Sequence, residues 1–298
     1  MFSTLTLLVA TAVAVQAASS NSTTNPYIPT DISSGCSTFL DTLNSDSDLP
    51  ACTKALITAT SAYGPGGTSG SASKAAVSST LDTVCASTAC PSHLIAGKLA
   101  SFYSACSAEL TSSPNTEVKT IYDTFYALLP LVGALCAKDD SGASCALSAP
   151  ASAAAAALEP ALAVSASSSV VRRDGTTAAA FLPNATTIAA NNILFLFLDG
   201  TLPKAQLCTT CTRNILSSYI SFESTTTYAP GLAQSVLMLG QSAIYSGVLG
   251  TCGSDFMTSA VKAAGGLSQS TGSSGALSLR AGGALAMLVG SVVAAILL

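Results

Sequence analysis

Ten cysteines constrain the fold of this chain more than any other feature of its sequence. In an oxidising compartment an even number of cysteines predicts up to five disulfide bonds. Seven cysteines precede an alanine-rich stretch in the middle of the chain and three follow it, and both numbers are odd. If all ten pair within one chain, at least one bond must therefore join the two parts. The cysteines are Cys36, Cys52, Cys85, Cys90, Cys106, Cys136, Cys145, Cys208, Cys211 and Cys252.

The start of the chain indicates the oxidising compartment. Residues 1–17 have an apolar centre followed by the small-residue pattern Val15-Gln16-Ala17. This pattern predicts a secretory signal peptide that is cleaved after Ala17, although no Lys or Arg precedes the apolar centre. A polar segment, 18–30, follows and contains the glycosylation sequon at Asn21.

Residues 266–298 contain small residues, a short polar spacer and an uncharged apolar run from Ala284 to Leu298. These are the three parts of a glycosylphosphatidylinositol (GPI) attachment signal, and we expect the lipid on Ser273. The apolar run is shorter than the roughly 20 residues that a helix needs to span a bilayer, and no Lys or Arg follows it. A weak single-pass anchor and a buried terminal helix are the alternatives.

Composition excludes one class of partner and indicates a glycoprotein. Only 9% of the 298 residues are charged and the net charge is -4, so the chain lacks the electrostatic basis for binding nucleic acid. Serine and threonine take the place of charge, which in a secreted chain favours extensive O-glycosylation. A second N-glycosylation sequon begins at Asn184.

Helical spacing of apolar residues predicts an all-α, disulfide-braced domain. We expect one cysteine-bearing helical segment at 31–148, an Ala/Ser-rich low-complexity insert at 149–180, and a second helical segment of the same domain at 181–265. Within them, Ile193 to Leu198 is continuously apolar and reads either as a buried strand or as the end of a buried helix. The helices are expected near 31–49, 51–63, 74–86, 92–110 (N-cap Ser92), 117–129 (ended or bent at Pro130), 232–249 and 254–264.

Candidate chemical motifs are few, and each has a structural interpretation that we prefer. Asn44 to Asp48 begins like a calcium loop but lacks the glycine and glutamate that such a loop needs, so we expect a turn. His93, the only histidine, is expected to face solvent at a helix start. Cys208-Thr-Thr-Cys211 is expected to pair elsewhere rather than to act as a redox motif.

Three other motifs also lack the partners that a reaction needs. Lys138 to Gly142 is expected to be a solvated turn, because an acid–base pair needs a pocket that separates the two pKa values. Gly240 to Ala243 begins like a nucleophile elbow but lacks its final glycine. Arg172-Arg173 is the only dibasic pair and marks either a processing site or an exposed loop.

Several longer blocks together resemble a family of secreted, often GPI-anchored, cysteine-containing fungal proteins. They cover most of the chain from Asp31 to Phe256 and are GCSTFLDTLNSD, FYSACSAEL, IYDTFYALLPLVGALCAKDDSGASC, CTTCTRNILSSYISFE, LGQSAIYSG and TCGSDF. The resemblance implies a fungal cell-surface protein and carries over no activity, ligand or catalytic residue. The chain does not resemble the eight-cysteine haem-capturing surface domains of fungi, whose cysteines are closer together.

We therefore expect a non-enzymatic, GPI-anchored glycoprotein of the cell surface or cell wall, with a structural, adhesion or recognition role. Its expected partners are the outer leaflet, through the lipid, and cell-wall polysaccharide or a surface protein. No catalytic residue, metal ligand or cofactor-binding residue is assigned. The alternative from another class is a secreted helical carrier of a small apolar ligand, which would contain an enclosed apolar cavity.

Overall fold

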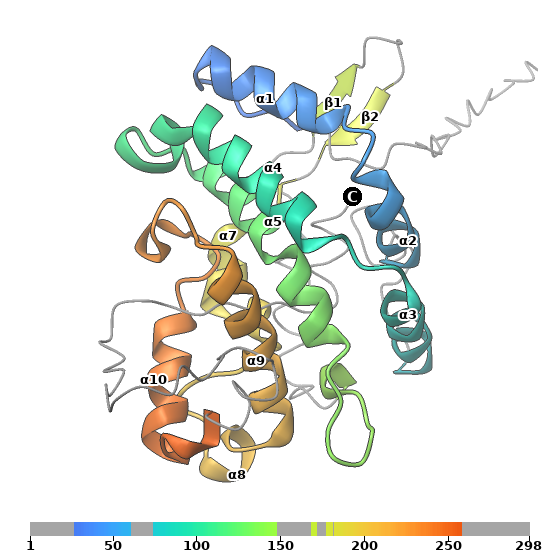
Figure 1. Ribbon diagram of the computed structural model, residues 1–298, viewed down its shortest axis with the longest axis vertical. Helices are drawn as coiled ribbons and strands as arrows, with labels where there is room; N and C mark the ends of the chain where they lie inside the picture. Colours follow the sequence, from blue (N-terminus) through green and yellow to red (C-terminus); the bar gives the residue numbers. More distant parts are fainter. Residues whose placement is uncertain (1–26, 61–73, 148–167, 172–176, 181, 258–298) are drawn as a thin grey trace, which may run out of the picture.

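The computed structural model describes residues 27–60, 74–147, 168–171, 177–180 and 182–257 (Figure 1). These residues form a mainly helical fold braced by five disulfide bonds, which confirms the predicted fold class. The helices are α1 (Ser34–Asn44), α2 (Pro50–Thr60), α3 (Lys74–Ala86), α4 (Ser92–Ala105), α5 (Thr116–Leu135), α7 (Ala185–Ala190), α8 (Lys204–Leu207), α9 (Thr210–Thr225) and α10 (Gln241–Cys252).

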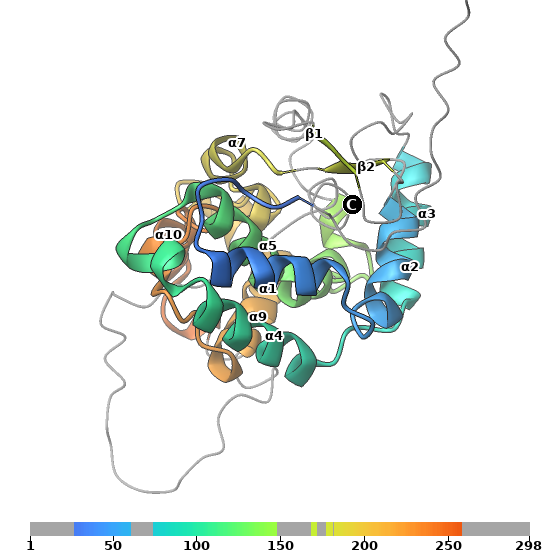
Figure 2. The same cartoon turned by 90° about the horizontal axis from the view of Figure 1, so that it is seen from above.

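Helix α5 lies at the centre of the fold. Helices α4 and α9 both pack against it, and α1 packs against α4 (Figure 1). Helices α2 and α3 pair with each other at one edge of the molecule, as the view from above also shows (Figure 2). Because α5 precedes the insert and α9 follows it, the main helix–helix contact of the fold joins the two helical segments.

A continuous chain of aromatic rings runs through this core. Neighbouring ring centroids are 5.0–5.3 Å apart and most pairs meet edge-on, the geometry in which aromatic pairs attract each other. Such a pair contributes about 0.5–1.5 kcal/mol beyond the apolar area that it buries. In order, the rings are Phe39, Phe102, Tyr122, Tyr228, Tyr126 and Phe222.

Helix caps explain where the first helices begin. Ser33, one of two adjacent serines at the start of α1, caps the helix by accepting a hydrogen bond from the backbone N–H of Cys36. Asn115 caps α5 in the same way through the N–H groups of Glu117 and Val118. The predicted N-cap at Ser92 is wrong, because Ser92 is the first helical residue and the cap position is held by Pro91, which has no side-chain acceptor.

Two predicted helix ends differ from the structure. The helix expected over 92–110 ends as α4 at Ala105, and a separate π-helical turn (η2, Ala108–Ser112) follows it. Helix α5 does not end at Pro130 and runs on to Leu135. A proline inside a helix costs about 3 kcal/mol. Burial of Pro130, Leu131 and Leu135 in the core offsets that cost.

The apolar run Ile193 to Leu198 is neither of the two structures that its sequence suggests. It forms a buried 3-10 turn (η4, Ile193–Phe195) whose chain then reverses through Leu196 and Phe197, with φ values of 53° and 61°. Non-glycine residues with such φ values cost about 1–3 kcal/mol each, so surrounding contacts must hold them. Complete burial of Ile193, Leu194 and Phe195 supplies those contacts.

The region expected as one helix over 232–249 is divided. It contains a 3-10 turn (η5, Leu232–Gln234), an irregular stretch, and then α10. The backbone packs closely at Gly247, because a Cβ there would lie 2.2 Å from the carbonyl oxygen of Gly200. A further helix expected near 254–264 is described only as far as Met257, where residues 255–257 are helical.

The segment expected as a low-complexity insert contains two β-strands that its sequence does not predict. Two short strands, β1 (Ser168–Val171) and β2 (Thr177–Ala180), pair antiparallel with Val171 opposite Thr177. Periodicity in such short segments is too brief to distinguish a strand from a coil. Among the helices that the structure describes, none is both long enough and apolar enough to cross a bilayer.

Candidate functional site

All ten cysteines lie in the described part of the chain, and none of them is free. Cys145–Cys211 joins the segment before the insert to the segment after it, as the odd numbers on the two sides require. The other bonds each close a loop within one segment. They are Cys36–Cys106, Cys52–Cys90, Cys85–Cys136 and Cys208–Cys252.

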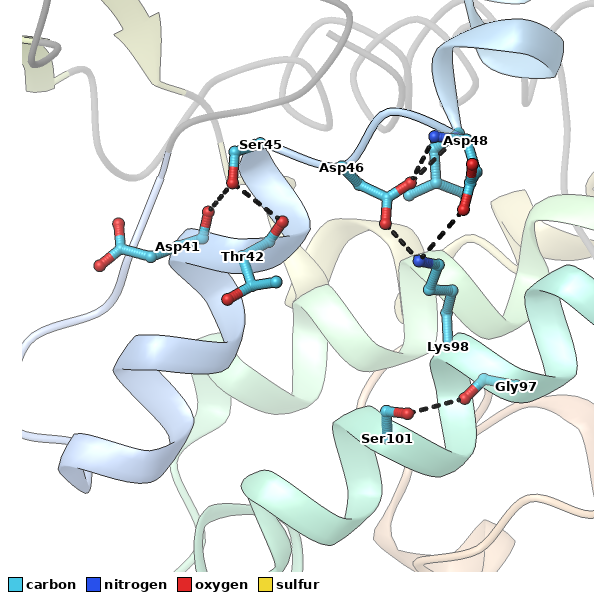
Figure 3. A network of polar contacts seen from close by, with 9 residues as sticks. Asp41, Thr42, Ser45, Asp46, Asp48, Gly97, Lys98 and Ser101 are labelled. Carbon is cyan, nitrogen blue, oxygen red and sulfur yellow. Dashed lines mark hydrogen bonds and ion pairs between the residues drawn. The ribbon is translucent and has the colours of Figure 1, made fainter.

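The calcium-like stretch Asn44 to Asp48 is a turn, as predicted. One carboxylate oxygen of Asp46 accepts hydrogen bonds from the backbone N–H groups of Asp48 and Leu49, at 2.9 and 3.0 Å. Its other oxygen forms an ion pair with Lys98 of α4, whose ammonium group also lies 3.9 Å from Asp48 (Figure 3). A lysine thus provides the positive charge between these carboxylates and fixes the α1–α2 turn to α4.

The pKa of Asp46 reflects this arrangement. Partial burial on its own raises the pKa, but the hydrogen bonds from Lys98, Leu49 and Asp48, together with the ammonium charge, lower it below its ordinary value of 3.8. His93 is exposed in the first turn of α4, where the sequence places it. Within the described residues, no three His, Cys, Asp or Glu side chains gather closely enough to hold a metal ion.

The CxxC motif is structural in the folded chain. Cys208 pairs with Cys252 at the end of α10, and Cys211 pairs with Cys145 beyond α5. The two cysteines of the motif are therefore not bonded to each other, which agrees with the predicted pairing elsewhere. Thr209, between them, caps α9 by accepting a hydrogen bond from the N–H of Thr212.

Beside these two disulfides lies a cleft of about 820 Å³, which is within the size range of small-molecule sites. Its apolar lining comes from the irregular segment after η4 and from α9, and its polar lining comes from the loop after α5, from α8 and from the start of α9. The apolar members are Leu196, Leu198, Leu202 and Ile215; the polar members are Asp139, Asp140, Ser141, Gln206, Thr209, Thr210 and Thr212; Cys145, Cys208 and Cys211 complete the lining.

Two carboxylates lie at the polar side of the cleft, in the turn that the sequence predicts between Cys136 and Cys145. Asp139 accepts hydrogen bonds from the hydroxyl and N–H of Ser141 and from the N–H of Ala143, at 2.6–2.9 Å. The Ser141 hydroxyl and then the Ala143 N–H lower the pKa of Asp139, so it is ionised at neutral pH. Asp140 accepts a hydrogen bond from the hydroxyl of Thr210 on α9.

A second polar cluster, which the sequence analysis missed, surrounds Asp123 on the buried face of α5. Its carboxylate is fully buried and accepts hydrogen bonds from the hydroxyls of Tyr228 and Ser235 and from the N–H groups of Val236 and Leu237. Burial raises the pKa of Asp123, and the four hydrogen bonds oppose that shift. The sequence does contain a signal for this cluster, because Asp123 is an acid among the apolar, core-facing positions of the helix.

The predicted modification sites are only partly within the described residues. Asn184 is half-buried and caps α7 through its carbonyl oxygen, which accepts a hydrogen bond from the N–H of Thr187. Asn21, Ser273, the signal peptide, the GPI signal and Arg172-Arg173 lie outside the described residues. No family model, curated protein or solved structure matches this chain.

Proposed function

We propose that this chain is a GPI-anchored glycoprotein of the extracellular surface or cell wall, with a non-enzymatic role in structure, adhesion or recognition. The observation that carries the proposal is the pairing of all ten cysteines in five disulfide bonds. Disulfides persist in oxidising compartments and are rare in the cytosol. This supports an extracellular or secretory location, in agreement with the apolar signal at residues 1–17.

The finer parts of the proposal rest on the sequence. The GPI lipid on Ser273, the glycans on Asn21 and Asn184, and the fungal surface family follow from sequence motifs and from the resemblance. Through the lipid the protein would lie on the outer leaflet, where cell-wall polysaccharide and surface proteins are the available partners. Its small number of charges agrees with a surface covered by glycans.

A non-enzymatic role is supported by what the buried acids contact. Asp123 accepts four hydrogen bonds from its own chain, and buried Glu109 accepts a hydrogen bond from the N–H of Ser33 at 2.6 Å. A general acid or base needs a proton-transfer partner within reach, in a site that substrate can enter. Both acids instead connect helices to neighbouring loops, which is a structural use.

Phospholipase release from intact cells tests the anchor. We expect a phosphatidylinositol-specific phospholipase to release the wild-type protein, and we expect a variant that lacks residues 284–298 to be absent from the releasable fraction. A variant with Ser242→Ala, an exposed residue on α10, serves as the control and should be released like wild type. A mature protein that retains Leu298, or a cytosolic protein with free thiols, would overturn the proposal.

The geometry of the cleft argues against a carrier of a wholly apolar ligand. A carrier of a wholly apolar ligand would enclose it, whereas this cleft is partly open and has carboxylate, hydroxyl and amide groups along one side. Binding at this cleft is compatible with a surface-bound protein and does not require a transport role. The chemistry of its lining indicates a narrower class of ligand.

A further inference from the structure

We propose that the cleft between the loop after α5 and the start of α9 binds an amphiphile with an alkyl chain and a protonated amine head. The chain would lie on Leu196, Leu198, Leu202 and Ile215, and the amine would lie near Asp139 and Asp140. This inference does not depend on the GPI anchor or on location, because it concerns only the folded domain.

The apolar side of the cleft is built at a cost in backbone conformation. Leu196 and Phe197 both have left-handed φ values, and this reversal brings Leu196 and Leu198 to the same cleft. Conformations of this kind concentrate at binding and active sites, where the surrounding structure holds them in place. The same reversal would not be needed if the apolar run simply continued as a helix or strand.

Disulfide bonds fix the walls of the cleft before any ligand arrives. Cys145–Cys211 ties the loop after α5 to the start of α9, and Cys208–Cys252 ties the preceding turn to α10. Cys145, Cys208 and Cys211 themselves line the cleft. A site whose walls are already ordered loses little conformational entropy on binding, which favours affinity for a small ligand.

The charges that line the cleft select the head group. Its charged side chains are those of Asp139 and Asp140, and no Lys, Arg or His is among the residues that line it. The start of α9 adds a partial positive charge of about half a unit, which offsets only part of two carboxylates. Arg213 is not among the residues that line the cleft, but its guanidinium donates a hydrogen bond to Thr210, whose hydroxyl donates to Asp140, and it also lies over the ring of Phe256. It therefore offsets part of the charge of Asp140 and leaves the cleft negative.

The lining also excludes one obvious alternative. The side chains that line the cleft are not aromatic, so a sugar ring would have no flat face on which to stack. The aliphatic wall, in which Leu202 is half-buried and Leu196, Leu198 and Ile215 are buried behind the surface, is instead suited to methylene groups. The wall polysaccharide proposed as a partner would therefore bind at another surface of the protein.

The test measures binding of three detergents with the same alkyl chain by calorimetry, below their critical micelle concentrations. The probes are dodecylamine hydrochloride, dodecyl maltoside and sodium dodecyl sulfate. We expect the amine to bind most tightly and to weaken as salt is added, because screening acts on exposed charges. Shortening its chain by two methylenes should weaken binding by about tenfold, since each buried methylene contributes to transfer from water.

Two double variants distinguish the effect of charge at the cleft from the effect of the net charge of the protein. Asp139→Asn with Asp140→Asn keeps both carbonyl acceptors, so the turn is preserved, and should weaken binding of the amine by about five- to tenfold. The matched control is Asp41→Asn with Asp82→Asn, which removes the same charge from exposed positions on α1 and α3 and should change little. Leu202→Asn, at a half-buried position, should weaken binding of all three probes.

Some results would overturn the proposal. Failure of all three probes to bind would do so, and so would dodecyl sulfate binding at least as tightly as the amine. Equal loss of amine binding in the cleft pair and the control pair would also overturn it, because net charge would then explain the effect. Loss of the GPI anchor in cells would contradict the proposed function and leave this binding result unchanged.

Discussion

Replacing Asp123 by alanine should destabilise the fold more than any other single removal of a carboxylate among the described residues. Asp123 is fully buried on α5, and its carboxylate holds the chain around Tyr228 and Ser235 to Leu237 against that helix. Alanine removes the acceptor for four donors at once. The loop that they belong to lies between α9 and α10, so the effect should reach both helices.

The magnitude follows from the geometry of the four donors. The O–H bonds of Tyr228 and Ser235 can rotate, but the N–H groups of Val236 and Leu237 are fixed by the backbone. A buried donor left without an acceptor costs about 1–3 kcal/mol, whereas removal of the buried charge recovers some desolvation energy. The net loss should be about 3 kcal/mol, or about 6–12 °C in Tm for a chain of this size.

Thermal unfolding without reductant measures this loss. Asp123→Asn supplies a second reading, because its carbonyl oxygen can still accept from the two fixed N–H groups while its amide turns toward Tyr228. That variant should lose only about 1 kcal/mol, or about 2–4 °C. Asp82→Ala, at an exposed position on α3, is the control and should change Tm by less than 2 °C, as is usual for about half a kcal/mol at a surface.

Two results would refute the reasoning. If Asp123→Ala unfolds at the same temperature as the exposed control, the four hydrogen bonds do not hold the loop. If asparagine at this position is as harmful as alanine, the charge matters and the acceptor geometry does not. Either result would indicate that the aromatic rings around Tyr228, and not the hydrogen bonds to Asp123, stabilise this region.

Three further predictions test other contacts. Asp46→Asn should lower the free energy of unfolding at neutral pH but not in acid. Because the folded pKa of Asp46 is lowered, the stability that its carboxylate contributes is present above about pH 4 and is lost as pH falls through the folded pKa. The urea midpoints of the wild type and the variant should therefore converge near pH 2. Gly247→Ala should cost about 1–3 kcal/mol because its Cβ would meet the backbone of the facing loop, whereas Gly250→Ala, with nothing within 4 Å, should gain about 0.5–1 kcal/mol; equal urea midpoints would contradict this. Replacing Cys145 and Cys211 together by serine should lower the free energy of unfolding by about 4 kcal/mol, since the bond spans 66 residues; a denaturation midpoint like that of wild type would argue against it.

Local signals in the sequence were sufficient for much of the fold. A serine cap of α1, at Ser33 or Ser34, and the bounds Lys74–Ala86 of α3 follow from capping and helical spacing, which act between near neighbours. The need for a bond across the insert follows from counting cysteines. Its identity as Cys145–Cys211 does not, because many pairings satisfy the same count.

What the sequence could not give depends on contacts between distant residues. Pro130 predicts that the helix ends or bends there, and packing against α9 and the rest of the core explains why α5 continues to Leu135. The run Ile193 to Leu198 has no periodicity, so its left-handed reversal could not be inferred. The partners of Asp123 are more than a hundred residues away along the chain.

The cleft illustrates the same limit for the site. Asp139 and Asp140 were correctly placed in a turn, but nothing near them in the sequence indicates the apolar residues that face them. Leu196, Leu198 and Leu202 are brought there by a backbone reversal, and Ile215 by α9. A site assembled from one loop, one irregular segment and two helices, α8 and α9, has no sequence motif.

The order of the disulfide bonds along the chain has a mechanical consequence for a tethered protein. A pull on the C-terminal side reaches Cys252 first and passes covalently to Cys208, so α10 cannot be peeled away. From there the load crosses to Cys145 through Cys211, and at the far end Cys106 passes it to Cys36. Between Cys36 and Cys252, most of the chain that can lengthen while the bonds hold lies from Cys106 to Cys145, where Cys85–Cys136 adds a second covalent path, and from Cys208 to Cys211. The bonds should therefore limit stretching of the domain to a small part of its full chain length.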